Sequence, residues 1–325
     1  MHALEGRSDI THGIVLAVWL ALFASGCSSA RVPSQNWLMC FSNPDGDVVL
    51  VDTSSDALYH GEGVTSTTML LSLKSRLRCA SFDVASGRIA TVQSDVSGEV
   101  VRVYGEDKSL LLERQCYSKT GGGIAPTACL NKGGTHVAFP LDESVVAICD
   151  LGGLGSSPSR GVVELKYKGN AISRSPRLVC YPSGEGGFLI QDDNAFYRVM
   201  PDGSQRNHPA GIERSGLLCG VCEGEPLITS GLFCSWTIRK GPNGDIIGTA
   251  KSGHSYANLM GVSPCGEFIA YSVPGAFSTR GQTHIHHLKT GRRAKLRVSP
   301  KWHLGTWVAR PAGKTRLNFE AELTE

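Results

Sequence analysis

The sequence predicts an all-β fold, a β-propeller of four-stranded blades, from three observations. A two-strand phrase with a glycine in its turn recurs along the chain, its spacing suits one blade, and each chain end supplies part of a blade. The 39 glycines and 19% charged residues are typical of short strands joined by turns. With 41% hydrophobic residues the chain can fill a large core, and we assign residues 36–325 to a single domain.

The first residues have the pattern of an export signal. Residues 14–23 (IVLAVWLALF) form an apolar run that is short for a membrane span but typical of a signal-peptide core. Ala24-Ser25-Gly26-Cys27 then resembles the lipobox of bacterial lipoproteins, in its relaxed spirochaete form. The resemblance implies a signal peptide over residues 1–26, a lipid on Cys27 and a short tether over residues 27–35. A plain secretory signal and an uncleaved signal anchor are the alternatives.

The recurring phrase is an apolar strand, a turn and a second apolar strand. Its copies span residues 79–92, 128–139, 178–190, 217–229, 260–272 and 306–319, with Gly87, Gly134, Gly187, Gly224, Gly266 and Gly313 in the turns. These glycines are 37 to 53 residues apart, which suits a four-stranded blade and disfavours a β-sandwich with irregular hairpins. Third strands are predicted within residues 100–107, 145–153, 195–204, 233–244 and 283–292, and weaker fourth strands at 110–115 and 162–167.

The two chain ends are predicted to share a blade. Residues 36–42 and 47–53 have the pattern of second and third strands, whereas residues 306–313 have the pattern of a first strand. Pairing the ends would close the ring and remove an open sheet edge. Five complete blades and one composite blade give six, and seven result only if the N-terminal strands form a blade of their own.

One copy is similar to the repeat of the WD40 family. Gly253-His254 precedes the stretch from Val262 to Gly266 (VSPCG), where that family has Gly-His and then Ser-Pro-Asp-Gly. The Trp-Asp pair that ends the third strand in the family is absent, and the nearest equivalents are Val51-Asp52 and Cys149-Asp150. The other copies resemble YncE-like and TolB-like propellers equally well. The resemblance implies a module that binds partners or assembles a complex of the cell envelope.

The sequence contains none of the common catalytic signatures, namely Walker A, GxGxxG after a strand, GxSxG or HExxH. We therefore assign no catalytic, cofactor-binding or metal site. Alternation places His284 and His286 on one face of a strand and His287 on the other, and with His303 the first two could hold zinc. Exposed or half-buried strand histidines are the simpler interpretation.

Acidic pairs and cysteines receive structural interpretations as well. Asp142-Glu143 and Asp192-Asp193 fit turns better than a calcium site. Cys219 and Cys222 are three residues apart, which predicts opposite faces of a strand and argues against a redox or zinc pair. The cysteines after Cys27 are predicted to be small buried hydrophobes, with a disulfide framework as the alternative.

The charge of the chain is concentrated late in the sequence. Residues 280–316 contain ten Lys and Arg but no Asp or Glu, whereas 29 acids and 22 bases lie elsewhere. A solvated face is the simpler interpretation, and a docking surface for an anionic partner is the functional one. The candidate residues for that surface are Arg280, Lys289, Arg292, Arg293, Lys295, Arg297 and Lys301. A net charge of +3 and the expected export both disfavour nucleic acid.

The leading functional hypothesis is a non-enzymatic interaction scaffold. It is exported and held by its lipid on the periplasmic or outer face of a membrane, and it binds a protein partner of the cell envelope. The alternative is a propeller hydrolase or lyase that acts on a small molecule or sugar polymer at the channel mouth. It requires three or more Asp, Glu or His side chains that converge there. The sequence identifies no small-molecule ligand.

Overall fold

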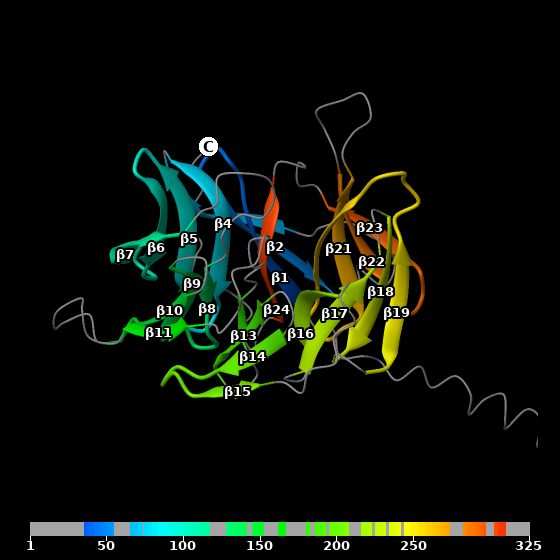
Figure 1. The fold of residues 1–325 in the computed structure, drawn as a ribbon. Coiled ribbons are helices and arrows are strands. Elements are labelled where there is room, and N and C mark those ends of the chain that lie inside the picture. The colour runs from blue at the N-terminus through cyan, green and yellow to red at the C-terminus, as the bar shows by residue number, and fades with distance from the viewer. Residues whose placement is uncertain are drawn as a thin grey trace, which may run out of the picture. The chain divides into compact units, whose positions relative to one another are not determined.

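The structure is a computed structural model, and it describes most of residues 36–309. The described ranges are 36–54, 66–73, 75–117, 128–141, 145–152, 162–166, 180–182, 186–192, 195–207, 216–222, 225–231, 234–241, 244–273, 282–296 and 302–309. They form antiparallel β-strands grouped in six four-stranded sheets (Figure 1). Cys27 and the predicted signal peptide and tether lie outside these ranges. Within the ranges, the structure contains no helix of the length and hydropathy needed to span a bilayer.

Each of the first three sheets in chain order is a run of antiparallel neighbours. One contains β24 (His303–Ala309), β1 (Asn36–Ser42), β2 (Asp47–Ser54) and β3 (Ser66–Ser72) in that order. The next contains β4 (Arg76–Asp83), β5 (Arg88–Asp95), β6 (Gly98–Tyr104) and β7 (Leu110–Cys116). The third contains β8 (Cys129–Leu130), β9 (His136–Pro140), β10 (Val145–Asp150) and β11 (Val162–Lys166).

The remaining sheets repeat this arrangement. One contains β12 (Cys180–Pro182), β13 (Phe188–Asp192), β14 (Ala195–Val199) and β15 (Gln205–Asn207). The next contains β16 (Leu217–Cys222), β17 (Glu225–Ser230), β18 (Ser235–Lys240) and β19 (Ile246–Lys251). The last contains β20 (Asn258–Val262), β21 (Phe268–Val273), β22 (Gln282–His287) and β23 (Arg293–Leu296).

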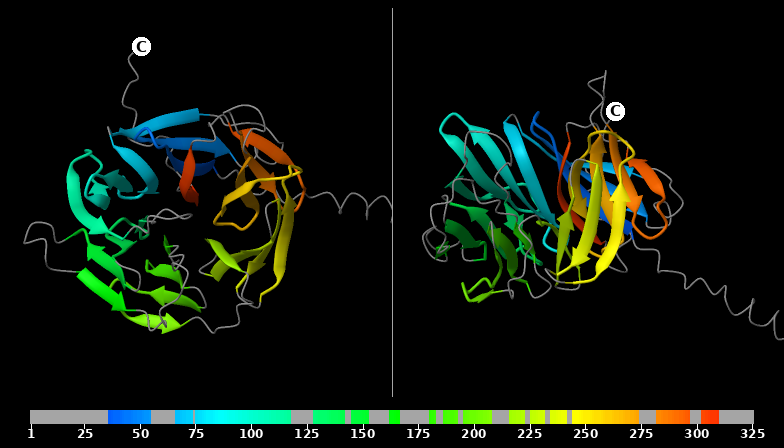
Figure 2. Two further views of the ribbon diagram at one scale, coloured as in Figure 1. Left: turned by 45° about the horizontal axis from the view of Figure 1, so that its top comes forward. Right: turned by 45° about the vertical axis from the view of Figure 1, so that its right-hand side comes forward.

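The sheets are arranged in a ring, with one strand of each sheet toward the centre (Figure 2). The inner strands β4, β8, β12, β16, β20 and β24 contact one another in sequence, and β24 contacts β4. The chain is therefore an all-β propeller, as predicted. The five phrases from residue 79 to residue 272 are the first two strands of successive sheets, and the predicted third strands are confirmed as β6, β10, β14, β18 and β22.

The turn inside the phrase explains why glycine recurs there. Gly87, Gly134 and Gly266 have φ of 67°, 64° and 72°, in the left-handed region that a side chain disfavours. The amide of Gly134 donates to the carbonyl of Asn131, and that of Gly266 donates to the carbonyl of Ser263. Glycine is favoured at these three positions because the turn reverses the chain tightly between two buried strands, and in the β12–β15 sheet the left-handed glycine is Gly186 (φ 85°) rather than Gly187.

The predicted pairing of the chain ends is confirmed. Strand β24 pairs antiparallel with β1, so that Met39 lies opposite Trp307. The rings of Trp37 and Trp307 are edge-on with centroids 6.3 Å apart, and Trp37 and Phe268 are 6.2 Å apart. This aromatic cluster connects the closing sheet to the β20–β23 sheet. The last phrase continues beyond Ala309, outside the described residues.

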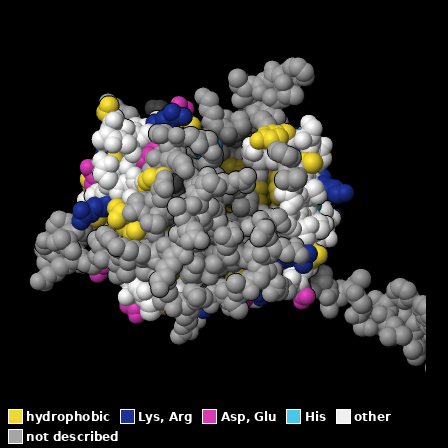
Figure 3. Space-filling view, viewed as in Figure 1, with side chains coloured by type: hydrophobic (Ala, Val, Ile, Leu, Met, Phe, Trp, Pro, Cys, Tyr) yellow, Lys and Arg dark blue, Asp and Glu magenta, His cyan; other side chains and the backbone are white. Residues whose placement is uncertain are grey.

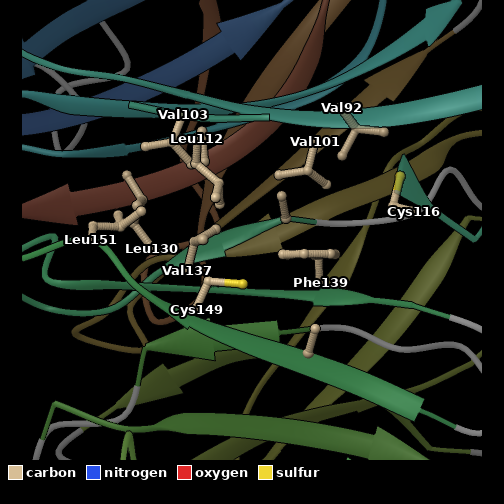
Figure 4. Packing of buried hydrophobic residues seen from close by; sticks show 13 residues of the cluster. Val92, Val101, Val103, Leu112, Cys116, Leu130, Val137, Phe139, Cys149 and Leu151 are labelled. Carbon is tan, nitrogen blue, oxygen red and sulfur yellow. The ribbon is translucent and has the colours of Figure 1, made fainter. Parts of the chain in front are cut away.

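The core lies between neighbouring sheets rather than in one central mass. Between the β4–β7 and β8–β11 sheets, buried side chains such as Val101, Val103, Val137 and Phe139 interdigitate (Figure 4). On the other face of the β4–β7 sheet, Leu77, Ile89 and Tyr104 pack toward the closing sheet. Each sheet therefore buries both faces, which explains the near-continuous apolar runs in the phrase.

Polar side chains also connect neighbouring sheets near the ring centre. The Thr306 hydroxyl on β24 accepts a bond from the Phe82 amide (3.1 Å) and donates to Ser81 (3.0 Å). The Ser81 hydroxyl in turn accepts from the Leu130 amide at 3.2 Å. Because these buried groups satisfy one another across sheet boundaries, they fix the spacing of the inner strands.

Candidate functional site

Four of the predicted basic residues lie together on the outer part of the β20–β23 sheet. Lys289 and Arg292 lie in the turn between β22 and β23, and Arg293 and Lys295 lie on β23, the outermost strand. All four are exposed. Arg280, Arg297 and Lys301 lie outside the described residues. On the face drawn in Figure 3, Lys and Arg side chains form separate groups, one of them beside β19 and β23. We call Lys289, Arg292, Arg293 and Lys295 the basic edge.

The members of the basic edge differ in their contacts. The Lys289 ammonium lies 3.2 Å from the Glu267 carboxylate, and its side chain is 69% exposed, so this ion pair adds little stability. Arg293 donates from two guanidinium nitrogens to the backbone carbonyls of Ser252 (2.9 Å) and Lys251 (2.7 Å). Arg293 therefore joins β23 to the end of β19 and holds the loop that carries His254.

Strand register places two histidines beside the basic edge. Across β21, β22 and β23, Tyr271, His284 and Lys295 are opposed in one row, and Ile269, His286 and Arg293 in the next. Ile269 and Tyr271 belong to the core shared with the β16–β19 sheet, so both rows are on that side of the sheet. We call this side the histidine face. The prediction that His284 and His286 share a face is confirmed.

Rings stack in the histidine face. His284 lies parallel to Tyr271, with an interplanar angle of 8° and centroids 5.5 Å apart, and His254 approaches His284 at 6.0 Å. Trp236 on β18 packs against Tyr271 at 5.2 Å. Tyr271 is fully buried and His284 is 7% exposed, whereas His254 is exposed. The stack thus extends from the core between two sheets to the solvent.

Burial and positive neighbours keep these histidines neutral. Burial lowers the pKa of His284, and His254, Lys295 and Arg293 lower it further. For His286, burial, Arg293 and His287 together lower the pKa to about 4. Both rings are therefore uncharged near neutral pH, beside a cationic edge.

The other sequence candidates do not join this site. His287 faces the closing sheet and contacts the Phe268 ring at 5.0 Å, as its alternation predicts. His303 lies on β24 and is exposed. In the described ranges, no three His, Cys, Asp or Glu side chains converge in a way that could hold a metal ion. Asp142-Glu143 and Asp193 lie outside those ranges.

The prediction that Cys219 and Cys222 lie on opposite faces of a strand is wrong. A bulge shifts the register between Leu218 and Gly220, so the alternation that would separate the two thiols is interrupted. Both cysteines belong to the core shared by β16–β19 and β20–β23. Neither forms a disulfide.

The cysteines behave as the buried hydrophobes that we predicted. The nine whose side chains the structure describes are buried or half-buried and form no disulfide. Burial raises the pKa of the Cys79 thiol to about 11 and that of Cys116 to about 12. Such thiols stay protonated at neutral pH and are poor nucleophiles and metal ligands.

Comparison with known proteins supports the fold and no more. No protein-family model matches the sequence, and a search of curated proteins finds no match. Among solved structures, TolB from Acinetobacter baumannii is similar, with a TM-score of 0.53 and 14% identity over 96% of this chain and 74% of TolB. A chain of a nidogen–laminin complex is similar over 85% of this chain and 98% of its own length, with a TM-score of 0.52 and 11% identity.

Sequence reasoning missed Tyr271 and the bridging role of Arg293. Tyr271 lies in an apolar strand (FIAYSV), so its contact with His284 depends on the register of β21 against β22. The sequence singled out Gly253-His254 for its resemblance to a family motif. In the structure, the His254 ring packs against His284. Pairing the predicted second and third strands in antiparallel order, with the start of one opposite the end of the other, could have placed Tyr271 opposite His284.

Proposed function

We propose that this protein is an exported interaction scaffold that is held at a membrane by a lipid on Cys27. Its six four-stranded sheets are, in this proposal, the six blades of one ring. The partner is a protein of the cell envelope with an acidic surface, which docks on the basic edge. A rigid ring with exposed charged side chains on an outer strand suits binding, because the scaffold need not order itself when a partner binds.

The observation that supports the proposal is the basic edge itself. Lys289, Arg292, Arg293 and Lys295 are exposed within seven consecutive residues, and Lys289 forms an ion pair with Glu267. Complementary charge accelerates and orients the docking of an acidic partner.

The proposal is tested by cross-linking in intact cells followed by purification from membranes. We expect the full chain to be recovered with a partner, and the double variant Lys289→Glu with Arg292→Glu to lose it. Lys132→Glu, a charge reversal at an exposed turn on the far β8–β11 sheet, is the matched control and should keep the partner. Recovery of monomeric protein alone, or equal recovery by both variants, would contradict the proposal.

A further inference from the structure

The histidine face and the basic edge bring four nitrogen-bearing side chains into one compact group. His284 lies opposite Lys295, and His286 lies opposite Arg293. Opposed Cβ atoms in antiparallel strands are about 5 Å apart, and alternate residues along a strand are about 7 Å apart. The group is therefore small enough for one ligand to reach several of its members.

Solvent reaches the group from one side. Arg293, Lys295 and His254 are exposed, whereas His284 and His286 beneath them are 7% and 6% exposed. His254 comes from the loop that Arg293 holds through the carbonyls of Lys251 and Ser252. A ligand arriving from solvent would thus meet Arg293, Lys295 and His254 first, and Arg293 is held in place by its bonds to the two carbonyls.

Two buried polar atoms of this face have unused hydrogen-bonding capacity. The His286 Nδ1 and the Tyr271 hydroxyl are buried, and neither has a hydrogen-bond partner among the described residues. A buried polar atom without a hydrogen-bond partner destabilises a fold, and the described ranges contain others of this kind, such as the indole nitrogens of Trp37 and Trp307. The His286 and Tyr271 atoms differ from those others in lying on a face that also carries Lys295 and Arg293, so the interior of this face is polar as well as its edge.

The electrostatic field at this place selects an anion. The charged groups that shift the pKa of His284 are His254, Lys295 and Arg293, and each lowers it, as a cation does. Arg293 has the same effect on His286. A metal cation would be repelled here, whereas an anion would be attracted.

We propose that this face binds a tetrahedral oxyanion of the phosphate or sulfate class, held by Lys295, His284 and His254 beside Arg293. Charge-assisted hydrogen bonds from several nitrogens suit the oxygens of such a group. This inference rests on the proposed function, because it places the oxyanion site on the surface that binds the partner. Free phosphate and the phosphate ester of a lipid headgroup share this chemistry.

Binding should take up protons. Without a ligand, the positive neighbours of His284 oppose protonation of its ring. A bound anion favours protonation, so the His284 ring gains a proton as the ligand binds. The titratable and charged groups that face it are Tyr271 on β21, Lys295 and Arg293 on β23, and His254 on the preceding loop; Trp236 and Ala250 of the β16–β19 sheet carry no charge. Affinity must therefore rise as the pH falls.

The test is calorimetric titration of the full chain in detergent with sodium sulfate, which stays a dianion across the pH range used. We expect binding about fivefold tighter at about pH 5.5 than at about pH 7.5, with proton uptake revealed by buffers of different ionisation enthalpy. Titrations with inorganic phosphate and glycerol 3-phosphate then separate the sources. Tighter binding of the ester assigns the site to a headgroup-like phosphate, and equal binding assigns it to the free anion.

Variants locate the site on the histidine face. Lys295→Gln should weaken sulfate binding about tenfold, the usual scale for one charge-assisted hydrogen bond. His284→Phe keeps a ring against Tyr271 but should abolish most of the proton uptake. Lys132→Gln is the matched control and should bind as the unmodified chain does, and a thermal melt of each variant checks that it folds.

The proposal is overturned if sulfate does not bind, if binding is independent of pH, or if Lys295→Gln binds like the Lys132→Gln control. The outcome is distinct from that of the cross-linking experiment. Loss of the partner in the Lys289 and Arg292 double variant without any sulfate binding would support the scaffold alone. Sulfate binding without a partner would support the oxyanion site alone.

Discussion

Replacing His286 by leucine should flatten the acid dependence of stability. In the folded chain the pKa of His286 is about 4, whereas in the unfolded chain the ring has its ordinary value of about 6.5. Because the unfolded chain holds the proton more tightly, protonation of His286 costs no stability above about pH 6.5, and stability is lost as the pH falls from about 6.5 toward 4.

The magnitude follows from the difference between the two pKa values. One pKa unit corresponds to about 1.4 kcal/mol, so His286 should lower the free energy of unfolding by about 3 kcal/mol between pH 7 and pH 4. The group is 6% exposed, so solvent screens this effect little. In His286→Leu, the free energy of unfolding should fall by about 3 kcal/mol less between pH 7 and pH 4. At pH 7 the variant should be about as stable as the unmodified chain, because the substitution removes an unpaired buried nitrogen.

Urea unfolding of both proteins at pH values from 4 to 8, followed by tryptophan fluorescence in sulfate-free buffer, measures this difference. His254→Gln, which changes an exposed ring on the neighbouring loop, is the matched control and should keep the steep acid loss. Parallel stability curves for His286→Leu and the unmodified chain would refute the reasoning.

Three further predictions concern closure, sheet spacing and the anchor. A Cβ on Gly305 would clash with the carbonyl oxygen of Ala80, so Gly305→Ala should destabilise the ring by about 3 kcal/mol or more in urea unfolding. Gly261→Ala is the control: its Cβ would have its nearest contact at 3.5 Å, so it should cost little in the same assay. Gln191→Leu removes bonds of 2.9 Å to the Leu218 amide and the Gly216 carbonyl and should cost about 2 kcal/mol in urea unfolding; an unchanged midpoint would contradict this. Cys27→Ala should abolish labelling by a fatty-acid analogue and release the protein from membranes, and unchanged labelling would contradict the lipobox.

The repeated phrase made the propeller predictable, because each copy contains a local signal. A left-handed glycine such as Gly134 between two apolar strands needs no knowledge of distant residues. The pairing of β24 with β1 was predictable for a related reason, since each chain end lacks the strands that the other supplies. The bulge at Cys219 was not, because one inserted residue reverses all later alternation without changing the composition of the strand.

The candidate site was predictable only in part. The sequence indicated the basic charge, including Arg293 and Lys295, and the shared face of His284 and His286. It could not show that Tyr271 stacks on His284 or that Arg293 binds the carbonyls of Lys251 and Ser252. Those contacts depend on register between strands and on packing between sheets, which no single segment encodes.

A polar face elsewhere in the ring, with an exposed ion pair beside buried polar groups, shows what the histidine face lacks. On the third strand of the β4–β7 sheet, Arg102 pairs with Glu113 at 2.6 Å and lies 3.8 Å from Asp95. Next to it, Gln93 donates to the hydroxyls of Thr91 (2.8 Å) and Tyr104 (2.9 Å).

That polar face is complete within its own sheet, because two carboxylates balance the guanidinium and the tyrosine hydroxyl is bonded. In the β20–β23 sheet, Arg293 bonds to backbone carbonyls that carry no net charge, and the Tyr271 hydroxyl has no partner among the described residues. The guanidinium and the tyrosine hydroxyl therefore have their partners within the β4–β7 sheet, whereas those of the β20–β23 sheet have no carboxylate partner and no hydroxyl partner among the described residues. An oxyanion bound to the histidine face would supply there the negative charge that Glu113 and Asp95 supply to Arg102.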